Sequence, residues 1–369
     1  MKSLKIVNVV GARPNFMKIA PIIDEMKKHD DIMPYLLHTG QHYDRVMSEL
    51  FFDQLGLPKP DIYLGIGSGG HGEQTGRIMI EFEKCMHDLQ PDMVLVVGDV
   101  NSTIACGLVA TKLGIKLVHV EAGLRSFDRT MPEEVNRVLT DQISDYLFTT
   151  EASAQQNLER EGISAEKVHF VGNVMIDSLL KHREKAGQSQ VLTELGLQPN
   201  SYLLVTLHRP ANVDDKEILT QLLDVLARLS ELTTVVFPVH PRTRNRVKEF
   251  ALDQKLQDYP ALKLVDPVGY LDFLHIMANS QAVVTDSGGI QEETSVLGVP
   301  CITARDNTER PVTVDVGTNI IVGRDPERIF SEAQKILAGN GKKGLLPPLW
   351  DGRAAERIVA VLREQAQAA

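Results

Sequence analysis

Short apolar runs alternate with longer amphipathic segments along the whole chain. Five runs of strand length stand in the first half, each followed by residues of helical period: Leu4–Val10, Ile32–Thr39, Met93–Gly98, Lys116–Val120 and Tyr146–Thr150. Six more stand in the second half: Tyr202–Thr206, Thr234–Val239, Leu262–Asp266, Ala282–Thr285, Pro300–Thr303 and Asn319–Val322. Because strands that alternate with helices pair in parallel and are covered on both faces, the pattern predicts an α/β fold.

A segment without strand character separates the two series. Leu179–Asn200 is charged, contains Gln and Ser, and ends in LQPN, which suits a connection between domains. A chain of 369 residues is long for one hydrophobic core, so we expect two Rossmann-like domains, over 1–180 and 181–351. After Asp351 the sequence predicts a polar helix with no strand behind it.

Composition and charge narrow the class of protein. The chain is 43% hydrophobic and 24% charged, as in an ordinary globular protein, and no apolar run approaches the roughly 20 residues of a membrane helix. Three scattered cysteines and an N-terminus without a signal-peptide cleavage site lead us to expect a reduced, cytoplasmic protein. A net charge of −10 argues against nucleic acid or an anionic membrane as the main partner. A small anion would need cations gathered locally.

Ligands of open parallel sheets bind beyond the carboxyl ends of the strands, so the residues there are the candidates. In the first half, GARPNFMK carries Arg13 and Lys18 in place of a glycine-rich dinucleotide fingerprint, and a bound anion would compensate cations at a helix start. Asp99, Glu121 and Glu133 follow later strands. Each alone is explained as a helix cap or first-turn carboxylate, but their convergence on one edge favours acid–base chemistry.

The second half places histidine and arginine together after two successive strands: His208 with Arg209, and His240 with Arg242. Such pairs suit an anion site. The Asp-Ser-Gly-Gly turn after Ala282–Thr285 opens a helix, whose free N–H groups and dipole attract an anion. A tight turn between strand and helix explains the same residues equally well.

Metal and nucleophile signatures are missing from the sequence. His38 and His42 are four residues apart but do not share a helix, and no acidic cluster has the spacing of a cation cage. The G-x-S-x-G pattern of a serine nucleophile is also missing. We therefore expect neither a metal nor a nicotinamide cofactor.

Eight blocks occur in one order between about Lys5 and Val322: GARPNFMK, TGQHY, GDVNST, HVEAGLRS, MPEEVNR, the His208-Arg209 turn, TDSGGIQEE and RDNTERP. Together they resemble the non-hydrolysing UDP-N-acetylglucosamine 2-epimerases. The resemblance implies two Rossmann-like domains in the GT-B architecture with the active site in the interdomain cleft. It also implies that the last helix, 352–369, packs back on the N-terminal domain, and that the protein is a homodimer.

The chemistry implied by the resemblance interconverts UDP-GlcNAc and UDP-ManNAc without a cofactor, as a step towards surface polysaccharide precursors. UDP is eliminated from carbon 1 as the proton on carbon 2 is removed, which leaves an enzyme-bound 2-acetamidoglucal. UDP then adds back after a proton returns on the opposite face.

The resemblance also implies roles for particular residues. Asp99, Glu121 and Glu133 are the acid–base carboxylates, and the sequence does not single out the base. Ser287, Gly288 and Gly289 bind the diphosphate and Glu293 a ribose hydroxyl, while Glu292 faces elsewhere. Among the remaining substrate-binding positions, His208 matches a histidine that shares a proton with the diphosphate. Four further cationic or histidine side chains match the family's substrate site: Arg13, Lys18, His240 and Arg310. Phe273 matches an aromatic position near uracil, although a core position on a helix explains this residue nearly as well.

A second bound substrate activates some members of the family. The positions that match this regulatory site are Gln41, His42, Gln74 and Arg209, but Glu73 stands where an arginine is expected. A carboxylate there would repel a diphosphate, which argues against activation by a second substrate molecule and leaves the question open.

Three further alternatives concern the function. HTGQHYDRVMSELFFDQLG and GIGSGGHGEQTG look closer to relatives that include 2-epimerases of UDP-2,3-diacetamido-2,3-dideoxyglucuronate. That sugar needs an additional cation, for which Arg125, Arg129 or His42 are candidates. A GT-B glycosyltransferase or a non-catalytic nucleotide-sugar sensor would share the fold.

Overall fold

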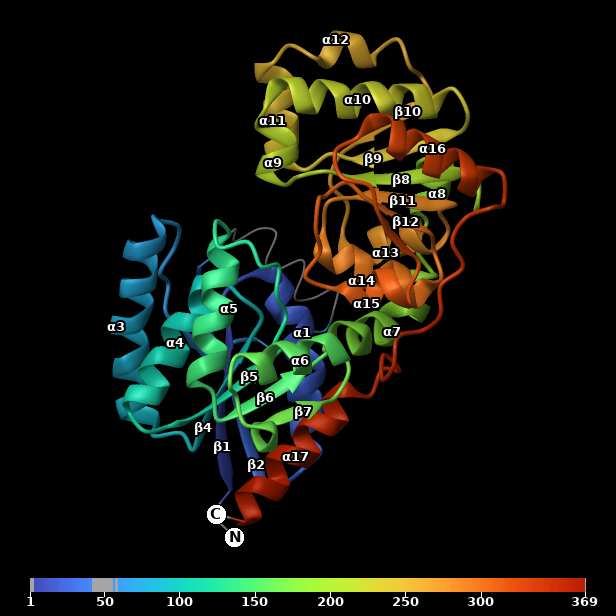
Figure 1. Ribbon diagram of the computed structural model, residues 1–369. Coiled ribbons are helices and arrows are strands. Elements are labelled where there is room, and N and C mark those ends of the chain that lie inside the picture. The colour runs from blue at the N-terminus through green and yellow to red at the C-terminus, as the bar shows by residue number, and fades with distance from the viewer. Residues whose placement is uncertain (1–2, 42–55, 57–58, 369) are drawn as a thin grey trace. The chain divides into compact units, whose positions relative to one another are not determined.

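Two parallel sheets, each flanked by helices, form the centres of two units, which the computed structural model describes for residues 3–41, 56 and 59–368 (Figure 1). The first unit comprises Met1–Lys181 with Pro348–Ala369, and the second comprises His182–Pro347. None of the helices in these described ranges is long and apolar enough to cross a membrane.

The first unit contains a seven-stranded sheet in the order β3-β2-β1-β4-β5-β6-β7. Its strands are β1 (Leu4–Val10), β2 (Ile32–His38), β3 (Ile62–Tyr63), β4 (Met93–Val97), β5 (Lys116–Val120), β6 (Tyr146–Thr149) and β7 (Val168–Phe170). Its helices are α1 (Arg13–Met26), α3 (His71–Leu89), α4 (Asn101–Lys112), α5 (Pro132–Ile143), α6 (Ala152–Arg160) and α17 (Ala354–Ala368), and α7 (Val174–Ala186) leads into the second unit.

The second unit contains a six-stranded sheet in the order β10-β9-β8-β11-β12-β13. Its strands are β8 (Tyr202–Thr206), β9 (Thr234–Pro238), β10 (Leu262–Val265), β11 (Ala282–Thr285), β12 (Cys301–Thr303) and β13 (Asn319–Ile321). Its helices are α8 (Val191–Glu194), α9 (Pro210–Val213), α10 (Lys216–Ser230), α11 (Pro241–Glu249), α12 (Asp253–Leu256), α13 (Tyr270–Ala278), α14 (Gly288–Leu297), α15 (Pro311–Asp315) and α16 (Pro326–Leu337).

The strand order reverses once in each sheet, between β1 and β4 and between β8 and β11. At such a switch point the connections leave in opposite directions, which opens a crevice beyond the carboxyl ends of the two strands. The central strands that form it are held by apolar cores, with Val94 and Val96 buried against α3 and α4 in the first unit and Val205 and Val284 buried in the second.

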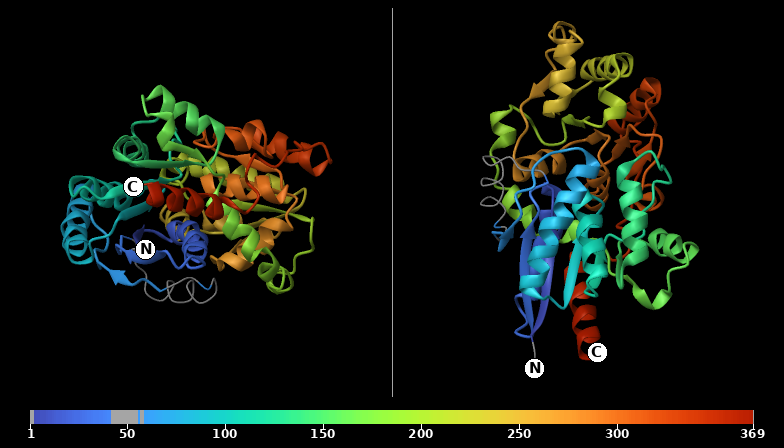
Figure 2. Two further views of the ribbon diagram at one scale, coloured as in Figure 1. Left: turned by 90° about the horizontal axis from the view of Figure 1, so that it is seen from below. Right: turned by 90° about the vertical axis from the view of Figure 1, so that its left-hand side faces the viewer.

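The C-terminal segment returns to the first unit, where α17 packs against α1 (Figure 2). The fully buried indole of Trp350 donates a 2.9 Å hydrogen bond to the carbonyl of Thr150. Asp177 then accepts from the first backbone N–H groups of α17 at Ala354 and Ala355. The sequence analysis predicted a polar helix here, but one face of α17 is apolar and fully buried, with Ile358, Val359 and Leu362 on it.

The predicted α/β class with two Rossmann-like domains is confirmed. The predicted strands are all present, several of them one residue shorter. The sequence analysis missed β3 and β7, which lie at the two edges of the first sheet. With two and three residues, they are too short to give an apolar run or an alternating pattern.

We expect Trp350→Phe to lower the free energy of unfolding of the first unit by about 1 kcal/mol, because a buried carbonyl loses its donor. Trp350→Ala should cost about 3–5 kcal/mol, since it also leaves a cavity. Urea unfolding followed by far-UV circular dichroism measures both. Unchanged stability in both variants would mean that this segment is not part of the folded unit.

Candidate active site

The switch point of the first unit begins with the turn between β1 and α1. Asn15 accepts a 2.9 Å hydrogen bond from the backbone of Ala12 and donates to the carbonyl of Val97 at 3.1 Å, so it ties this turn to the end of β4. One helical turn later, Lys18 Nζ lies 2.5 Å from Glu121 Oε2. The predicted residues Lys18 and Glu121 are therefore brought together. The side chain of Arg13 lies outside the described part of the chain.

Glu121 is held in an unusual conformation. Its φ of 68° lies in the left-handed region, and its side chain is buried. One carboxylate oxygen pairs with Lys18, while Oε1 is buried without a hydrogen-bond partner among the described residues. Buried carboxylate oxygens are rarely left without a donor, and one that is marks a candidate for contact with a ligand.

Asp99 follows β4 and is anchored from α5. Arg137 donates to Asp99 Oδ2 from Nε at 3.0 Å and from Nη2 at 2.6 Å, and Asn136 holds the Asp99 carbonyl at 2.8 Å. The third guanidinium nitrogen, Arg137 Nη1, contacts Glu134 Oε2 at 2.7 Å. A buried arginine thus bridges the candidate Asp99 and the first turn of α5.

The two adjacent glutamates of α5 differ in their surroundings. Glu134 is buried and accepts backbone hydrogen bonds from Ser126 and Phe127. Burial alone would raise the pKa of Glu134, but hydrogen bonds from the Ser126 backbone and from Arg137 lower it below its ordinary value. Glu133 is only partly buried, and its assignment as an acid–base group stays a prediction.

Behind these groups lies a buried charge network. His119 contacts Asp141 Oδ1 at 2.6 Å and the Gly98 carbonyl at 2.9 Å, and Arg125 contacts Asp141 Oδ2 at 2.7 Å. Arg125 also forms a two-pronged pair with Glu161 at 2.8 and 2.6 Å. All three guanidinium nitrogens of Arg125 therefore have partners within the first unit, since Nη1 also donates to the Leu124 carbonyl at 2.8 Å, and its role as a cation for a carboxylate on the sugar stays a prediction.

The switch point of the second unit is organised by Asp286, the residue that follows β11. Its fully buried carboxylate contacts His208 Nδ1 at 3.0 Å and accepts from backbone N–H groups of the turn after β8. The ring of His240 stands 5.4 Å from that of His208 between centroids. Burial and the His208 ring lower the pKa of His240 below its ordinary value, although the Asp286 carboxylate opposes this shift.

The glycine turn begins α14 and leaves its N-terminal N–H groups without a side-chain cap or an acidic residue in the first turn. An added Cβ at Gly289 would meet nothing within 4 Å, so the space beside this N–H is open. At Gly288 a Cβ would lie 2.7 Å from Arg310 Nη1, and only glycine lets the guanidinium approach so closely. Ser287–Gly289 and Arg310 are therefore neighbours, as an anion site requires.

Arg310 is flanked by two carboxylates. Its Nε pairs with Glu292, and its Nη1 lies 2.6 Å from Glu309 Oε1. Arg305 contacts the other oxygen of Glu309 at 2.9 Å. Glu292 is buried and contacts Arg310, the predicted diphosphate-binding arginine, whereas its neighbour Glu293 contacts Tyr270.

Glu293 is buried and accepts a 2.9 Å hydrogen bond from the hydroxyl of Tyr270 on α13. Burial raises the pKa of Glu293 to about 7, and the neighbouring Glu292 adds to this, although Tyr270 opposes it. Phe273, the predicted uracil contact, is half-buried one turn further along α13.

The predicted regulatory residues are only partly placed. Gln41 and Gln74 lie together, and their amides are engaged inside the first unit with Ser102 and Asn101. Arg209 belongs to the second unit, and His42 lies outside the described residues.

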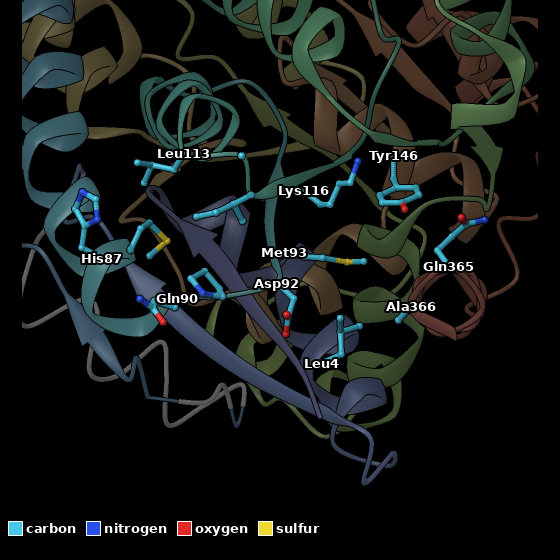
Figure 3. A pocket seen from close by; sticks show the side chains of 14 residues that line it. Leu4, His87, Gln90, Asp92, Met93, Leu113, Lys116, Tyr146, Gln365 and Ala366 are labelled. Atoms are coloured by element: carbon cyan, nitrogen blue, oxygen red, sulfur yellow. The ribbon is translucent and has the colours of Figure 1, made fainter. Parts of the chain in front are cut away.

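A cavity of about 610 Å³ lies in the first unit, and Figure 3 shows the side chains that line it. Its lining includes Leu4, Met93, Lys116 and Tyr146, the first residues of four strands. It is therefore at the amino edge of the sheet, opposite the candidate site. Among the residues described, no group of three or more His, Cys, Asp or Glu side chains could hold a metal ion.

Comparison with known proteins identifies the family. The family model for UDP-N-acetylglucosamine 2-epimerase matches residues 24–363. The chain belongs to this epimerase family. UDP-N-acetylglucosamine 2-epimerase of Methanocaldococcus jannaschii is 46% identical over 364 residues, which cover 97% of this chain and 99% of the relative. UDP-2,3-diacetamido-2,3-dideoxy-D-glucuronate 2-epimerase of Pseudomonas aeruginosa is 42% identical over 338 residues, 90% of this chain and 92% of that protein.

Solved structures of the epimerase family superimpose closely. The M. jannaschii enzyme in complex with UDP-GlcNAc and UDP has a TM-score of 0.89 at 45% identity, over 98% of this chain and all of that chain. The Neisseria meningitidis enzyme bound to UDP-GlcNAc has a TM-score of 0.88 at 31% identity, again over 98% of this chain and all of that chain. The predicted family is confirmed.

The sequence analysis missed the residues that hold the candidate groups in place. Arg137, Asp141 and Asp286 are buried partners of predicted site residues or of the backbone beside them. For Arg137 a signal was available, because Glu134 and Arg137 are three residues apart in a predicted helix and such pairs face each other.

We expect Glu293→Gln to make stability less dependent on pH. A folded-state pKa of about 7 lies above the ordinary 4.5, so the wild-type contribution is fully present below pH 4.5 and is lost as the pH rises to about 7. This shift corresponds to about 3 kcal/mol. Urea unfolding between pH 4 and 8 should show the loss in the wild type and a smaller loss in the variant. Parallel curves would contradict the assignment.

Proposed function

We propose that this protein is a non-hydrolysing UDP-N-acetylglucosamine 2-epimerase that interconverts UDP-GlcNAc and UDP-ManNAc. The observation that carries the proposal is the near full-length similarity to proteins of that name, in a chain whose strand ends carry the groups the reaction needs. Those groups are the Asp99 and Glu121 carboxylates in one unit and the α14 N-terminus with Arg310 in the other.

In the proposed reaction UDP leaves carbon 1 as a proton is taken from carbon 2, and enzyme-bound 2-acetamidoglucal remains. A proton then returns to the opposite face before UDP adds back. Removal from one face and delivery to the other require two acid–base groups, and Asp99 and Glu121 are each oriented by a cationic partner. Preformed donors at Gly288, Gly289 and Arg310 would stabilise the charge that develops on the departing diphosphate.

The surroundings of Arg125 support UDP-GlcNAc over the diacetamido glucuronate. Each guanidinium nitrogen of Arg125 already has a partner: Nε and Nη2 contact Glu161, Nη2 also contacts Asp141, and Nη1 donates to the Leu124 carbonyl. Arg129 is exposed and remains the candidate cation for the alternative sugar among the residues described.

We further propose a cytoplasmic homodimer whose product feeds a surface polysaccharide. The scattered cysteines support the cytoplasmic location, and the resemblance to the epimerase family supports the homodimer and the polysaccharide role.

The decisive test is incubation with UDP-GlcNAc in deuterium oxide. We expect deuterium at carbon 2 together with the manno isomer. Asp99→Asn should abolish exchange while UDP affinity stays within about tenfold, or about 1.4 kcal/mol, because Asp99 acts on the sugar. Asp88→Asn, on the exposed end of α3, is the charge-matched control and should exchange normally.

Other outcomes assign other functions. Release of UDP only with an added acceptor would indicate a glycosyltransferase, and binding without exchange would indicate a sensor. Turnover of the diacetamido glucuronate alone would make that sugar the substrate. Loss of both exchange and UDP affinity in Asp99→Asn would give Asp99 a structural role.

A pair of glycine substitutions tests the diphosphate site. Gly289→Ala should leave stability unchanged or slightly higher, because its methyl group meets open space, yet weaken UDP binding by about tenfold or more, because it blocks the approach to the N–H. Gly288→Ala should lower stability as well, since it displaces Arg310. Calorimetric titration and thermal unfolding separate the effects. Full UDP affinity in Gly289→Ala would place the diphosphate elsewhere.

A further inference from the structure

The carboxylate of Asp286 and the ring of His208 form a buried pair within the second unit. Asp286 Oδ1 lies 3.0 Å from His208 Nδ1, and the Asp286 side chain is fully buried while 35% of the His208 side chain is exposed. The other ring nitrogen, Nε2, makes no hydrogen bond within the described ranges, so it is the outward-facing atom of the pair.

The second oxygen of Asp286 is saturated by donors. Asp286 Oδ2 accepts from the backbone N–H of His208 at 2.9 Å, from that of Arg209 at 2.9 Å and from Asn212 Nδ2 at 3.1 Å, while the same His208 N–H lies further from Oδ1, at 3.2 Å. Asn212 also donates to the carbonyl of Ala304 at 3.0 Å, so its amide orientation is fixed. These contacts prevent the carboxylate from turning, and Oδ1 must face the imidazole.

An ionised carboxylate can only accept, so the ring nitrogen that faces it must carry a proton. Burial alone would raise the pKa of Asp286, but the hydrogen bonds from His208 and from the two backbone N–H groups lower it, and the group is ionised at neutral pH. Among the residues that the structure describes, the other titratable or charged groups near the ring are His240 and Arg242 at the start of α11, and the adjacent Arg209. The arginines have no acceptor atom, and His240 Nδ1 already accepts from the Arg242 backbone N–H at 3.2 Å.

We propose that Asp286 is a positioning residue for His208. When the His208 ring is neutral, Asp286 keeps its single proton on Nδ1, so Nε2 is the atom that exchanges a proton with the diphosphate. This rests on the proposed function. As the bond between carbon 1 and oxygen breaks, the proton on Nε2 of the imidazolium moves to the β-phosphate oxygen, and the neutral ring keeps its Nδ1 proton towards Asp286. Re-addition of UDP returns the proton to Nε2.

Asp286→Asn should reverse the tautomer. The amide introduced there must keep its oxygen towards the three donors that meet Oδ2, which turns its NH₂ towards His208 Nδ1. That nitrogen must then accept, and the proton moves to Nε2. The nitrogen-15 spectrum of histidine-labelled protein, assigned with His208→Gln and recorded where the ring is neutral, should show Nδ1–H in the wild type and Nε2–H in the variant.

The kinetic expectation follows from the tautomer. Asp286→Asn should lower kcat for epimerisation by about 10²–10⁴-fold, the range for a lost acid–base group, with a smaller change in KM. Asn212→Ala is the matched control, because it removes one donor to Asp286 but keeps the carboxylate. It should retain the Nδ1–H tautomer even if it lowers stability.

Two results would overturn the proposal: Nε2–H in the wild type, or the same tautomer and kcat in Asp286→Asn as in the wild type. Failure of the proposed function is a separate outcome. If the wild type does not epimerise UDP-GlcNAc but its His208 tautomer still depends on Asp286, the positioning role stands and the reaction assignment falls.

Discussion

Charge at the carboxyl ends of the strands must be neutralised locally, and the candidate groups within each unit depend on this constraint. An isolated ion buried at such a place costs several kcal/mol, and a partner with further hydrogen bonds offsets part of that cost. In the first unit Lys18 meets Glu121, and Arg137 meets Asp99. In the second unit Asp286 meets His208, and Arg310 meets Glu292. Each pair joins elements that are far apart in the sequence, so the same contacts fix the geometry of the loops.

Because of this constraint, a cationic side chain of the site contributes more through its fixed orientation than through its charge. Arg310 is not a bare positive charge that waits for a phosphate, since Glu292 and Glu309 both touch it. Its guanidinium is held in one orientation, and the uncapped N–H groups of α14 supply the attraction that its neutralised charge does not. Preorganisation, more than net charge, is what this site offers to an anion.

The sequence predicts the fold and the candidate groups well because both follow from local pattern. Apolar runs mark the strands, and residues directly after them, such as Asp99 and Ser287, lie at the edge where ligands bind. Contacts between distant residues leave no such mark. Nothing near Arg125 in the sequence indicates that Asp141 and Glu161 occupy its guanidinium, and nothing near Glu292 indicates Arg310. A shift of one residue along α5 likewise decides whether Glu133 or Glu134 meets Arg137.

The return of the C-terminal segment to the first unit has a consequence for how the chain is made. Because Trp350 and α17 complete that unit, the second unit is an insertion within it, joined by two connections near Lys181 and Pro348. During synthesis the ribosome delivers the whole inserted unit before the last piece of the first one emerges. The surface of the first unit that α17 covers therefore stays exposed to solvent until the end of synthesis. A chain that stops before Trp350 would contain a complete second unit and an incomplete first unit.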